Sequence, residues 1–336
     1  MKRMTKSERI EAAIRGEQVD RVPISLWRHF HLRDRAPGQL AEVTLALHRK
    51  FDTDLIKLTP SGLYPIQDWG ATIQFGKDDD SAPMPYRPAV ASAEEWETLL
   101  RLDVTKGALR RELEMVHQVA SGLHGTTPLM MTIFSPLTIA HKLRMDMVSS
   151  QRLIDDLRQS PRQLHAGLAI ICDVMRDYVT ACLEAGASGF FFATQLASYD
   201  SLTRQEYEQF GVAYDLPVLE SMIARSRITM LHICGNNVIF DLLSAYPVDV
   251  INWDDRGSGT SLSEARQITK KALAGGLSLD TLANGTDEDV LRDARNTIAE
   301  AGRRGFILAP SCVIPGPTPD TNLSAARRAV EETAIL

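Results

Sequence analysis

Short apolar runs recur along the chain, and longer segments in which apolar residues return every three or four positions separate most of them. The runs are rich in β-branched and aromatic residues, a composition typical of buried strands. Eight runs are predicted to be strands: 22–27, 55–58, 129–134, 189–193, 228–232, 248–253, 272–277 and 306–309. Strands that alternate with helices in this way indicate βα units around a parallel sheet.

Signals at the helix starts support this alternation. Thr5 and Glu8 have the spacing of a capping box and precede apolar residues at helical spacing, which predicts an N-terminal helix that ends near Gly16. Thr286 is the predicted N-cap of a late helix. The helices expected from periodicity farther along the chain cover 204–224, 262–271 and 287–302.

Eight βα units without a break in composition predict one closed (β/α)8 TIM barrel, an α/β fold in which residues 1–336 form a single domain. Residues 59–127 separate the second and third strands and contain an acidic, proline-rich loop followed by a capped helix. We expect them to form an insertion that packs beside the barrel or covers its mouth as a lid. An open doubly wound sheet is the alternative fold, but no glycine-rich nucleotide-binding motif follows any predicted strand.

Charge and composition narrow the function. The 336 residues carry a formal net charge of −6, which argues against a general nucleic-acid binder with a basic surface. No apolar run approaches the roughly 18 residues that cross a membrane. No apolar signal core follows the basic N-terminus, so we expect a cytoplasmic protein without a membrane partner. Four cysteines in a chain of this length are not a disulfide framework, and clustered thiols in a reducing compartment are more often metal ligands or nucleophiles.

In a barrel, active-site residues gather at the carboxyl ends of the strands. Two of the four cysteines and three of the eight histidines lie at the predicted ends. The side chains at those ends are Trp27, His29, His31, Lys57, Ser135, Gln195, His232, Cys234, Asp254, Asp255, Asp280, Ser311 and Cys312. We therefore expect the chemistry of the protein to reside there.

His232 and Cys234 stand two positions apart at the end of a predicted strand, so both side chains point to the same side of the sheet. Cys312, at the end of the last strand, can reach the same mouth, and Asp254 offers an oxygen from the neighbouring strand. Zinc accepts imidazole, thiolate and carboxylate ligands in a tetrahedral site. The pattern predicts a zinc site with His232, Cys234 and Cys312 as ligands and an exchangeable fourth position.

Each of these residues also has a structural interpretation. An H-x-C pair alone is more often a buried cysteine beside a hydrogen-bonded histidine. Cys172 and Cys182 lie in a helical stretch and are expected in the core. In this interpretation Asp254 and Asp255 cap the following turn, and His29 and His31 are packed polar residues.

Two thiolate ligands make a zinc site electron-rich, which suits the binding and deprotonation of a substrate thiol better than the generation of hydroxide. The expected chemistry is therefore alkyl transfer to sulfur.

Motifs spread over nearly the whole chain resemble one family. They occupy 9–23, 134–136, 231–236, 282–286 and 312–323, and include Leu-His-Ile-Cys-Gly-Asn and Cys-Val-Ile-Pro-Gly-Pro. Their order and spacing resemble the uroporphyrinogen decarboxylase superfamily and, within it, the cobamide-dependent (methylcobamide:thiol) methyltransferase branch. The resemblance implies a (β/α)8 barrel, with zinc as the cofactor and a methylated corrinoid protein as the methyl donor and partner. It also implies a small-molecule thiol such as coenzyme M as the acceptor.

The resemblance also implies roles for particular residues. His232, Cys234 and Cys312 map onto the zinc ligands of that branch. Asp254 maps onto the carboxylate ligand of the related zinc-dependent methionine synthases. Asp254 and Gln195 are expected to orient or balance the catalytic site. The residues expected to bind substrate are Trp27, His29, His31, Lys57, Ser135 and Asn236.

The decarboxylase branch is the main alternative. Its arginine-rich segment and its F-x-D-I motif, which carries an essential aspartate, are not reproduced at 25–33 and 51–57, although Arg28 and Arg33 are present. Transfer to homocysteine or to a folate also remains open. A protein without catalytic activity, either a partner of a corrinoid protein or a zinc-binding scaffold, is the third hypothesis.

Overall fold

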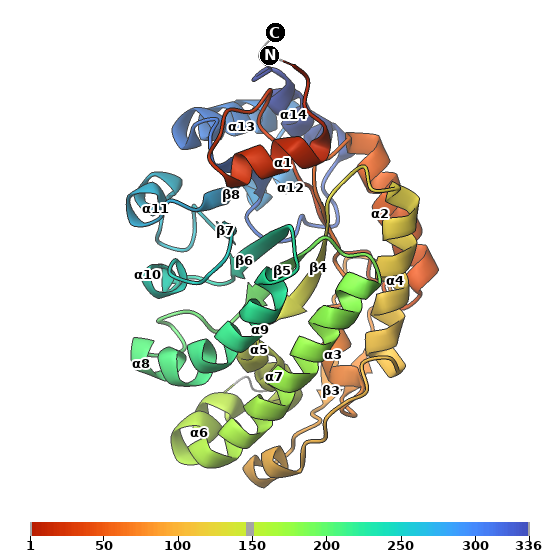
Figure 1. Ribbon diagram of the computed structural model, residues 1–336, viewed down its shortest axis with the longest axis vertical. Coiled ribbons are helices and arrows are strands. Elements are labelled where there is room, and N and C mark those ends of the chain that lie inside the picture. The colour runs from red at the N-terminus through yellow and green to blue at the C-terminus, as the bar shows by residue number, and fades with distance from the viewer. Residues whose placement is uncertain (1, 146–150, 335–336) are drawn as a thin grey trace.

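The computed structural model describes residues 2–145 and 151–334 (Figure 1). Seven parallel strands form one curled sheet in which the order in space follows the order in the chain. The strands are β1 (Ile56–Lys57), β4 (Leu129–Phe134), β5 (Gly189–Thr194), β6 (Ile228–Ile233), β7 (Val250–Trp253), β8 (Ala272–Leu277) and β9 (Phe306–Pro310). This order excludes the doubly wound alternative, in which the strand order reverses at a switch point.

The first predicted strand, 22–27, is not a regular strand, which corrects the expectation of eight. Leu308 of β9 exchanges two backbone hydrogen bonds with this segment, at 2.9 and 3.0 Å, and Asp54 N donates to Ile24 O at 2.8 Å. The segment is therefore hydrogen-bonded on both sides, to β9 and to the residues before β1. Pro23 has no N–H to donate, which limits the length of the ladder that can form here.

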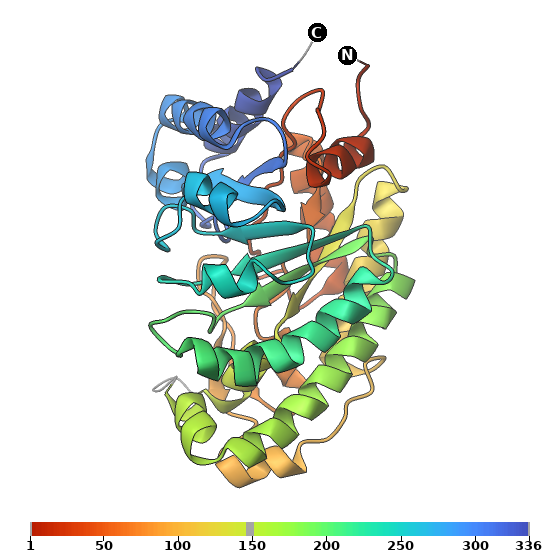
Figure 2. The same ribbon diagram turned by 60° about the vertical axis from the view of Figure 1, so that its left-hand side comes forward.

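Helices surround the sheet on its outer side. The longer ones are α1 (Lys6–Ile14), α2 (Pro37–Phe51), α4 (Gly107–Leu123), α7 (Pro161–Glu184), α9 (Ala213–Ile223), α13 (Asp287–Ala301) and α14 (Asp320–Glu331). The shorter ones are α5 (Pro136–Arg144), α6 (Arg152–Gln159), α8 (Arg204–Tyr207), α10 (Phe240–Leu243), α11 (Leu262–Ile268) and α12 (Leu279–Asn284), with a π-helical turn at Glu208–Val212. Helix α14 packs on α2, α2 on α4, α4 on α7 and α7 on α9. Both chain ends lie at the same end of the molecule (Figure 2).

Two of the predicted helix starts are confirmed, whereas the capped helix expected in 59–127 is a 3₁₀ helix, Ala93–Thr98, without a side-chain cap at Ser92. Thr5 forms a capping box with Glu8 at the start of α1, and Thr286 does the same with Asp289 at the start of α13. No helix among the described residues is long and apolar enough to cross a membrane.

The region 59–127 divides into two parts. Its last helix, α4, packs on α2 and α7 and connects β1 to β4, so it belongs to the ring of helices. The rest contains α3 (Tyr64–Gln67), an antiparallel hairpin of β2 (Thr72–Gln74) and β3 (Met84–Arg87), and a 3₁₀ helix at Ala93–Thr98. The hairpin loop contacts the segments after 22–27 and β9. Asp79 accepts a hydrogen bond from Leu32 N at 2.8 Å, and a Cβ atom at Gly316 would collide with Asp80.

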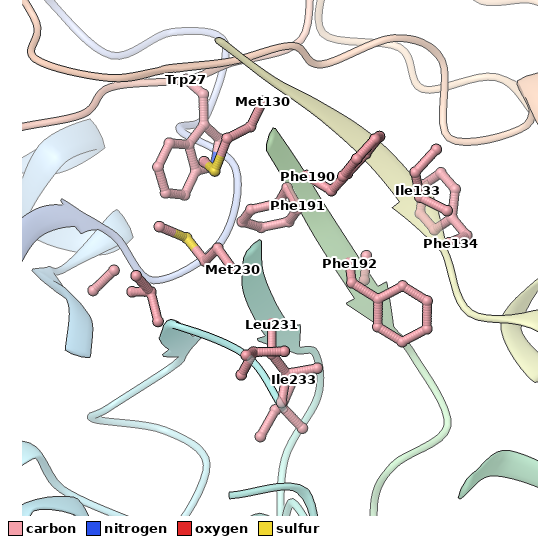
Figure 3. Packing of buried hydrophobic residues seen from close by; sticks show 14 of the residues in the cluster. Trp27, Met130, Ile133, Phe134, Phe190, Phe191, Phe192, Met230, Leu231 and Ile233 are labelled. Atoms are coloured by element: carbon pink, nitrogen blue, oxygen red, sulfur yellow. The ribbon is translucent and has the colours of Figure 1, made fainter. Parts of the chain in front are cut away.

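Bulky side chains fill the interior of the sheet. Strands β4, β5 and β6 are buried along their whole length, as expected for parallel strands that helices cover on the outer face. Figure 3 shows Phe191 on the same side of β5 as Trp27, whereas Phe192 points to the other side. The Trp27 and Phe191 rings meet edge to face with their centroids 5.6 Å apart. This packed interior supports the residues at the carboxyl ends of the strands.

Candidate metal centre

Three of the predicted ligands meet at the carboxyl ends of β6 and β9. His232 lies in β6, Cys234 follows that strand, and Cys312 follows β9. One ligand atom of each lies within 4.8 Å of the others, and Cys312 Sγ is 3.7 Å from His232 Nε2. Zinc bonds of about 2.0 Å to nitrogen and 2.3 Å to sulfur place tetrahedral ligand atoms about 3.5–3.8 Å apart. The three side chains therefore fit a zinc ion.

The orientation of the His232 ring is fixed by a residue that the sequence analysis missed. Asn252 in β7 is the register partner of His232, and its Oδ1 lies 2.7 Å from His232 Nδ1. Asn252 Nδ2 donates to Ala274 O at 2.9 Å and to Pro310 O at 3.1 Å, so Oδ1 is the acceptor toward the ring. His232 Nδ1 consequently carries the proton, and the Nε2 lone pair faces the two thiols. This is the second-sphere arrangement that orients metal-binding histidines.

An aromatic side chain supports the other face of the ring. Phe191 stacks on His232 with centroids 5.1 Å apart, and Phe191 in turn contacts Trp27. Trp27 is fully buried, and its Nε1 has no hydrogen-bond partner within the described chain. The indole thus lies one ring away from His232.

The contact between the two thiols shifts their pKa values in opposite directions. The pKa of Cys312 is lowered because the Cys234 thiol donates a hydrogen bond to its sulfur and because His232 lies beside it. The same contact with Cys312, together with burial, raises the pKa of Cys234. A dication bound here would remove the thiol protons, because coordination deprotonates thiols.

Two buried lysines flank the thiols. Burial lowers the pKa of Lys57, in β1, to about 7, and the Cys312 thiol opposes this shift. Burial likewise lowers the pKa of Lys142, in α5, to about 7, opposed by Cys234. The sequence analysis selected Lys57 but missed Lys142. Strongly perturbed amines in one region are typical of functional sites.

The loop after 22–27 adds further polar groups. Burial, reinforced by the charge of Lys57, lowers the pKa of His29 to about 3. His29 and His31 stack with ring centroids 4.8 Å apart, and His31 Nδ1 is 3.6 Å from an Asp34 oxygen. His29 Nδ1, His31 Nδ1 and both Asp34 carboxylate oxygens are buried without a hydrogen-bond partner in the described part of the chain. Such a concentration of unpaired atoms is typical of a ligand pocket.

Comparison with models of known protein families gives a match over nearly the whole chain. The model of the uroporphyrinogen decarboxylase (URO-D) family matches residues 5–333. The chain belongs to the URO-D family. The resemblance expected from the sequence motifs is thereby confirmed.

The similar curated proteins are methyltransferases. Methylcobamide:CoM methyltransferase MtbA of Methanosarcina acetivorans is 24% identical over 343 residues, which cover 96% of each chain. Methylcobamide:CoM methyltransferase MtaA of Methanosarcina barkeri (strain Fusaro) is 23% identical over 361 residues, 99% of each chain.

Two solved structures share the fold of this URO-D family protein. A methyltransferase from Methanosarcina mazei superposes with a TM-score of 0.84 at 21% identity and covers 98% of this chain and 99% of its own. A B12-independent methionine synthase from Shewanella sp. W3-18-1 gives a TM-score of 0.57 at 15% identity, over 88% of this chain and 87% of its own.

Asp254 does not join the three-residue cluster of this URO-D family protein. Its Oδ1 accepts a hydrogen bond from Arg256 N at 3.2 Å, and its carbonyl accepts from the backbone and side chain of Ser258. The next residue, Asp255, accepts from Gly276 N at 2.9 Å. The Asp254 carboxylate caps the following turn, as in the structural interpretation, whereas the Asp255 carboxylate caps the backbone of β8 instead. The role of Asp254 as a fourth ligand stays a prediction.

The remaining predicted residues lie around the mouth. Ser135 is buried and caps α5 through Thr138. Asn236 is exposed, and its carbonyl accepts from Ser198 Oγ at 2.6 Å. Gln195 is exposed after β5 and lines a cavity of about 620 Å³. Cys172 and Cys182 are both buried in α7, away from the cluster.

Proposed function

We propose that this URO-D family protein is a zinc-dependent methyltransferase that moves a methyl group from a methylated corrinoid protein to a thiol acceptor such as coenzyme M. The convergence of His232, Cys234 and Cys312 carries the proposal, because two thiolates and an imidazole leave one position for an acceptor sulfur. The relatives MtbA and MtaA are named methylcobamide:CoM methyltransferases, and this name supports methyl transfer from a methylcobamide to a thiol.

Each part of the site then has a task. Zinc, when bound, holds the acceptor sulfur as a thiolate at neutral pH. The sulfur attacks the methyl carbon in line, so that an S–C bond forms and the cobalt–carbon bond breaks with its electron pair left on cobalt. Asn252 keeps the proton on His232 Nδ1, and Phe191 holds the ring in place. The contribution of the chain is positioning, which converts a bimolecular reaction into a local one.

The residues around the cluster are assigned to two sites, one for the methyl acceptor and one for the methyl donor. We assign Trp27, His29, His31 and Lys57 to the acceptor pocket. Within residues 2–145 and 151–334, one ring nitrogen of each of the first three is buried without a hydrogen-bond partner, and the buried Lys57 ammonium forms no ion pair with a carboxylate. Gln195 lines the cavity on the other side of the mouth, where the donor would enter. The further roles inferred from the family are those of Asp254 as a balancing or fourth ligand and of Ser135 and Asn236 in substrate binding.

The same proposal includes the finer architecture. We infer that the segment 22–27 closes the seven strands into a complete (β/α)8 barrel within one domain, since it is hydrogen-bonded to β9 and to Asp54 before β1. The β2–β3 hairpin would form the rim or lid on that side of the mouth, and the enzyme would act in the cytoplasm.

A metal and activity measurement tests the function. The purified protein is expected to contain about one zinc per chain and to demethylate methylcobalamin when a thiol is added. A strong chelator should abolish the reaction, and added zinc should restore it. A zinc-free preparation with full activity would overturn the proposal.

The decarboxylase alternative is disfavoured by the position of Asp54. This aspartate, in the region compared with the F-x-D-I motif, is buried and binds Arg9 and Arg21 at the amino end of the sheet. It is therefore not available to a substrate at the mouth. Metal-independent decarboxylation of a porphyrinogen would favour the alternative.

A further inference from the structure

A cavity of about 350 Å³ lies at the amino ends of three neighbouring strands, β4, β5 and β6. Its lining residues come from the segments that lead into these strands, from α1 and from the end of α4. One water molecule takes up roughly 30 Å³ in the liquid. The cavity is therefore large enough for a small organic molecule, and its volume falls within the usual range of ligand pockets.

This cavity is separate from the candidate metal centre. Ile228, the first residue of β6, lines the cavity, whereas His232 lies four residues farther along the same strand. A strand rises about 3.3 Å per residue, so about 13 Å separates the two positions along β6. The chemistry of a barrel takes place at the carboxyl ends of its strands. A small ligand at the amino ends would therefore not compete with a methyl donor or a methyl acceptor.

Most of the buried lining of the cavity is apolar. Its large apolar residues, each no more than 5% exposed, are Ile10, Leu123, Leu129 and Ile228. Thr127 is the polar exception, and its hydroxyl is already hydrogen-bonded to His48 Nε2 at 3.2 Å. Apolar surface of this kind gains free energy when it contacts the hydrocarbon part of a ligand.

The charged residues of the lining are Arg225, Arg227 and Glu11, so two positive charges and one negative charge leave a net charge of +1. Both arginines are exposed, and neither guanidinium forms an ion pair or a side-chain hydrogen bond within residues 2–145 and 151–334. Elsewhere an exposed arginine such as Arg295 binds a carboxylate, that of Glu332. The N–H groups of Arg225 and Arg227 are therefore available to an anion in the cavity.

We propose that this cavity binds a small organic monoanion, a carboxylate with an apolar body. The carboxylate would pair with Arg225 and Arg227, and the body would lie on the buried apolar residues. One negative charge matches the net charge of the lining, and the planar guanidinium group matches the geometry of a carboxylate. The proposed site does not depend on the methyltransferase function, because it shares no residue with the metal centre.

Calorimetric titration of the zinc-loaded full-length protein provides the test. Benzoate is the probe, benzyl alcohol has a similar body without the charge, and acetate has the charge without the body. The buffer contains no carboxylate and little salt, because salt screens exposed charges. The variants are Arg225→Gln, Arg227→Gln and the double substitution. Arg304→Gln is the matched control, since Arg304 is also exposed, precedes β9 and forms no ion pair within the described residues.

We expect benzoate to bind at one site per chain and more tightly than either acetate or benzyl alcohol. Each single substitution should weaken benzoate binding about 10-fold, the usual effect of losing one hydrogen bond between charged groups. The double substitution should weaken it further, and the control should bind like the wild type.

Three further measurements separate ligand binding from a structural role and from the metal centre. Without benzoate, the arginine variants should melt at the wild-type temperature, because exposed side chains without partners contribute little to stability. Benzoate should raise the melting temperature of the wild type more than that of the double variant. Cys312→Ser should bind benzoate like the wild type, and the arginine variants should keep their zinc.

Wild-type protein that binds no benzoate would overturn the proposal, and so would a double arginine variant that binds benzoate as tightly as the wild type. Loss of benzoate binding in Cys312→Ser would place the anion at the metal centre instead. Equal affinities for benzoate and benzyl alcohol would contradict the role of the two arginines. None of these outcomes changes the test of the methyltransferase function, which rests on zinc and thiol methylation.

Discussion

At the amino ends of the strands, two arginines and two aspartates are buried together. At the carboxyl ends, two lysines are buried beside two cysteines, and neither lysine forms an ion pair with a carboxylate of the described residues. Arg9 binds Asp20 through two hydrogen bonds of 2.6 and 2.8 Å and binds Asp54 at 2.6 Å. Arg21 binds both oxygens of Asp54, at 2.6 and 2.9 Å. We call these four residues the amino-end network.

The two regions differ in how the cost of burying a charge is compensated. Burial would raise the pKa of Asp20, but hydrogen bonds from Arg9 outweigh it and lower the pKa to about 2. Lys57 and Lys142 have no such compensation, and burial lowers their pKa to about 7. Loss of one partner from a buried ion pair destabilises the fold, whereas buried charges without such a partner are typical of functional sites. The predictions below test this division from the largest effect to the smallest.

Cys312→Ser is expected to abolish zinc binding and activity without destabilising the fold. We expect zinc content to fall below about 0.1 per chain and thiol methylation to fall about 10³-fold or more, since both need the third ligand. Unfolding of the metal-free protein should change little. Cys172→Ser is the control, and retained zinc in Cys312→Ser would contradict the assignment.

Arg9→Met should produce the opposite pattern. It leaves Asp20 and Asp54 short of a cation in a buried site, a change that typically costs about 3–5 kcal/mol of unfolding free energy. Zinc content per folded chain should stay the same. Urea unfolding measures the loss, with Arg15→Met as the exposed control, which should change little. Equal stability of Arg9→Met and Arg15→Met would contradict a stabilising role for the amino-end network.

Asn252→Leu should weaken zinc binding about 10- to 100-fold, the usual effect of a lost second-sphere partner. Asn252→Asp keeps an oxygen acceptor for His232 Nδ1 and should bind zinc more tightly than the leucine variant. Competition with a chromogenic chelator measures both affinities. If both variants bind zinc like the wild type, the ring is oriented by its stacking on Phe191 instead.

Asp215 sharpens the comparison because it is a buried acid without a cation. Its Oδ2 accepts from Tyr246 at 2.7 Å and Tyr207 at 3.0 Å, and its Oδ1 has no partner in the described chain. Burial raises the pKa of Asp215 to about 7, against the opposing effect of the two phenols. The folded protein therefore binds a proton that the unfolded chain releases near pH 4, and stability should decrease as pH rises toward 7.

We expect this group to contribute a decrease of about 1–2 kcal/mol between pH 5 and 7, because each pH unit with one extra bound proton changes stability by about 1.4 kcal/mol. Asp215→Asn should remove that part of the pH dependence. Urea unfolding from pH 5 to 7 measures it. Parallel curves for the variant and the wild type would show that Asp215 does not titrate in this range.

Much of the fold was predictable because apolar runs report burial directly. Seven of the eight predicted runs are strands, and β4 and β8 have the predicted bounds. The segment 22–27 has the same apolar character, but regular pairing depends on backbone donors, and Pro23 lacks one. Helix α4 was assigned to the insertion because only tertiary packing shows that it continues the ring of helices.

In the candidate site, too, some residues could be predicted from the sequence and others could not. His232 and Cys234 were predictable because their spacing follows from strand geometry. The role of Asn252 could not be predicted, because it depends on the register of β6 with β7, which cannot be derived from the sequence. Lys142 sits near the end of a short helix, where a lysine is ordinary, and only its burial over Phe134 distinguishes it.

The position of Cys312 has a consequence for biosynthesis. A ribosome releases β6 with His232 and Cys234 long before β9 and the loop after it emerge. With the proposed zinc site, an unfinished chain would therefore offer the metal two ligands instead of three. Metal uptake would then wait until the last strand has docked beside β8. A truncated or misassembled chain would then lack zinc, so the zinc content of a preparation would measure the fraction of chains that have completed folding.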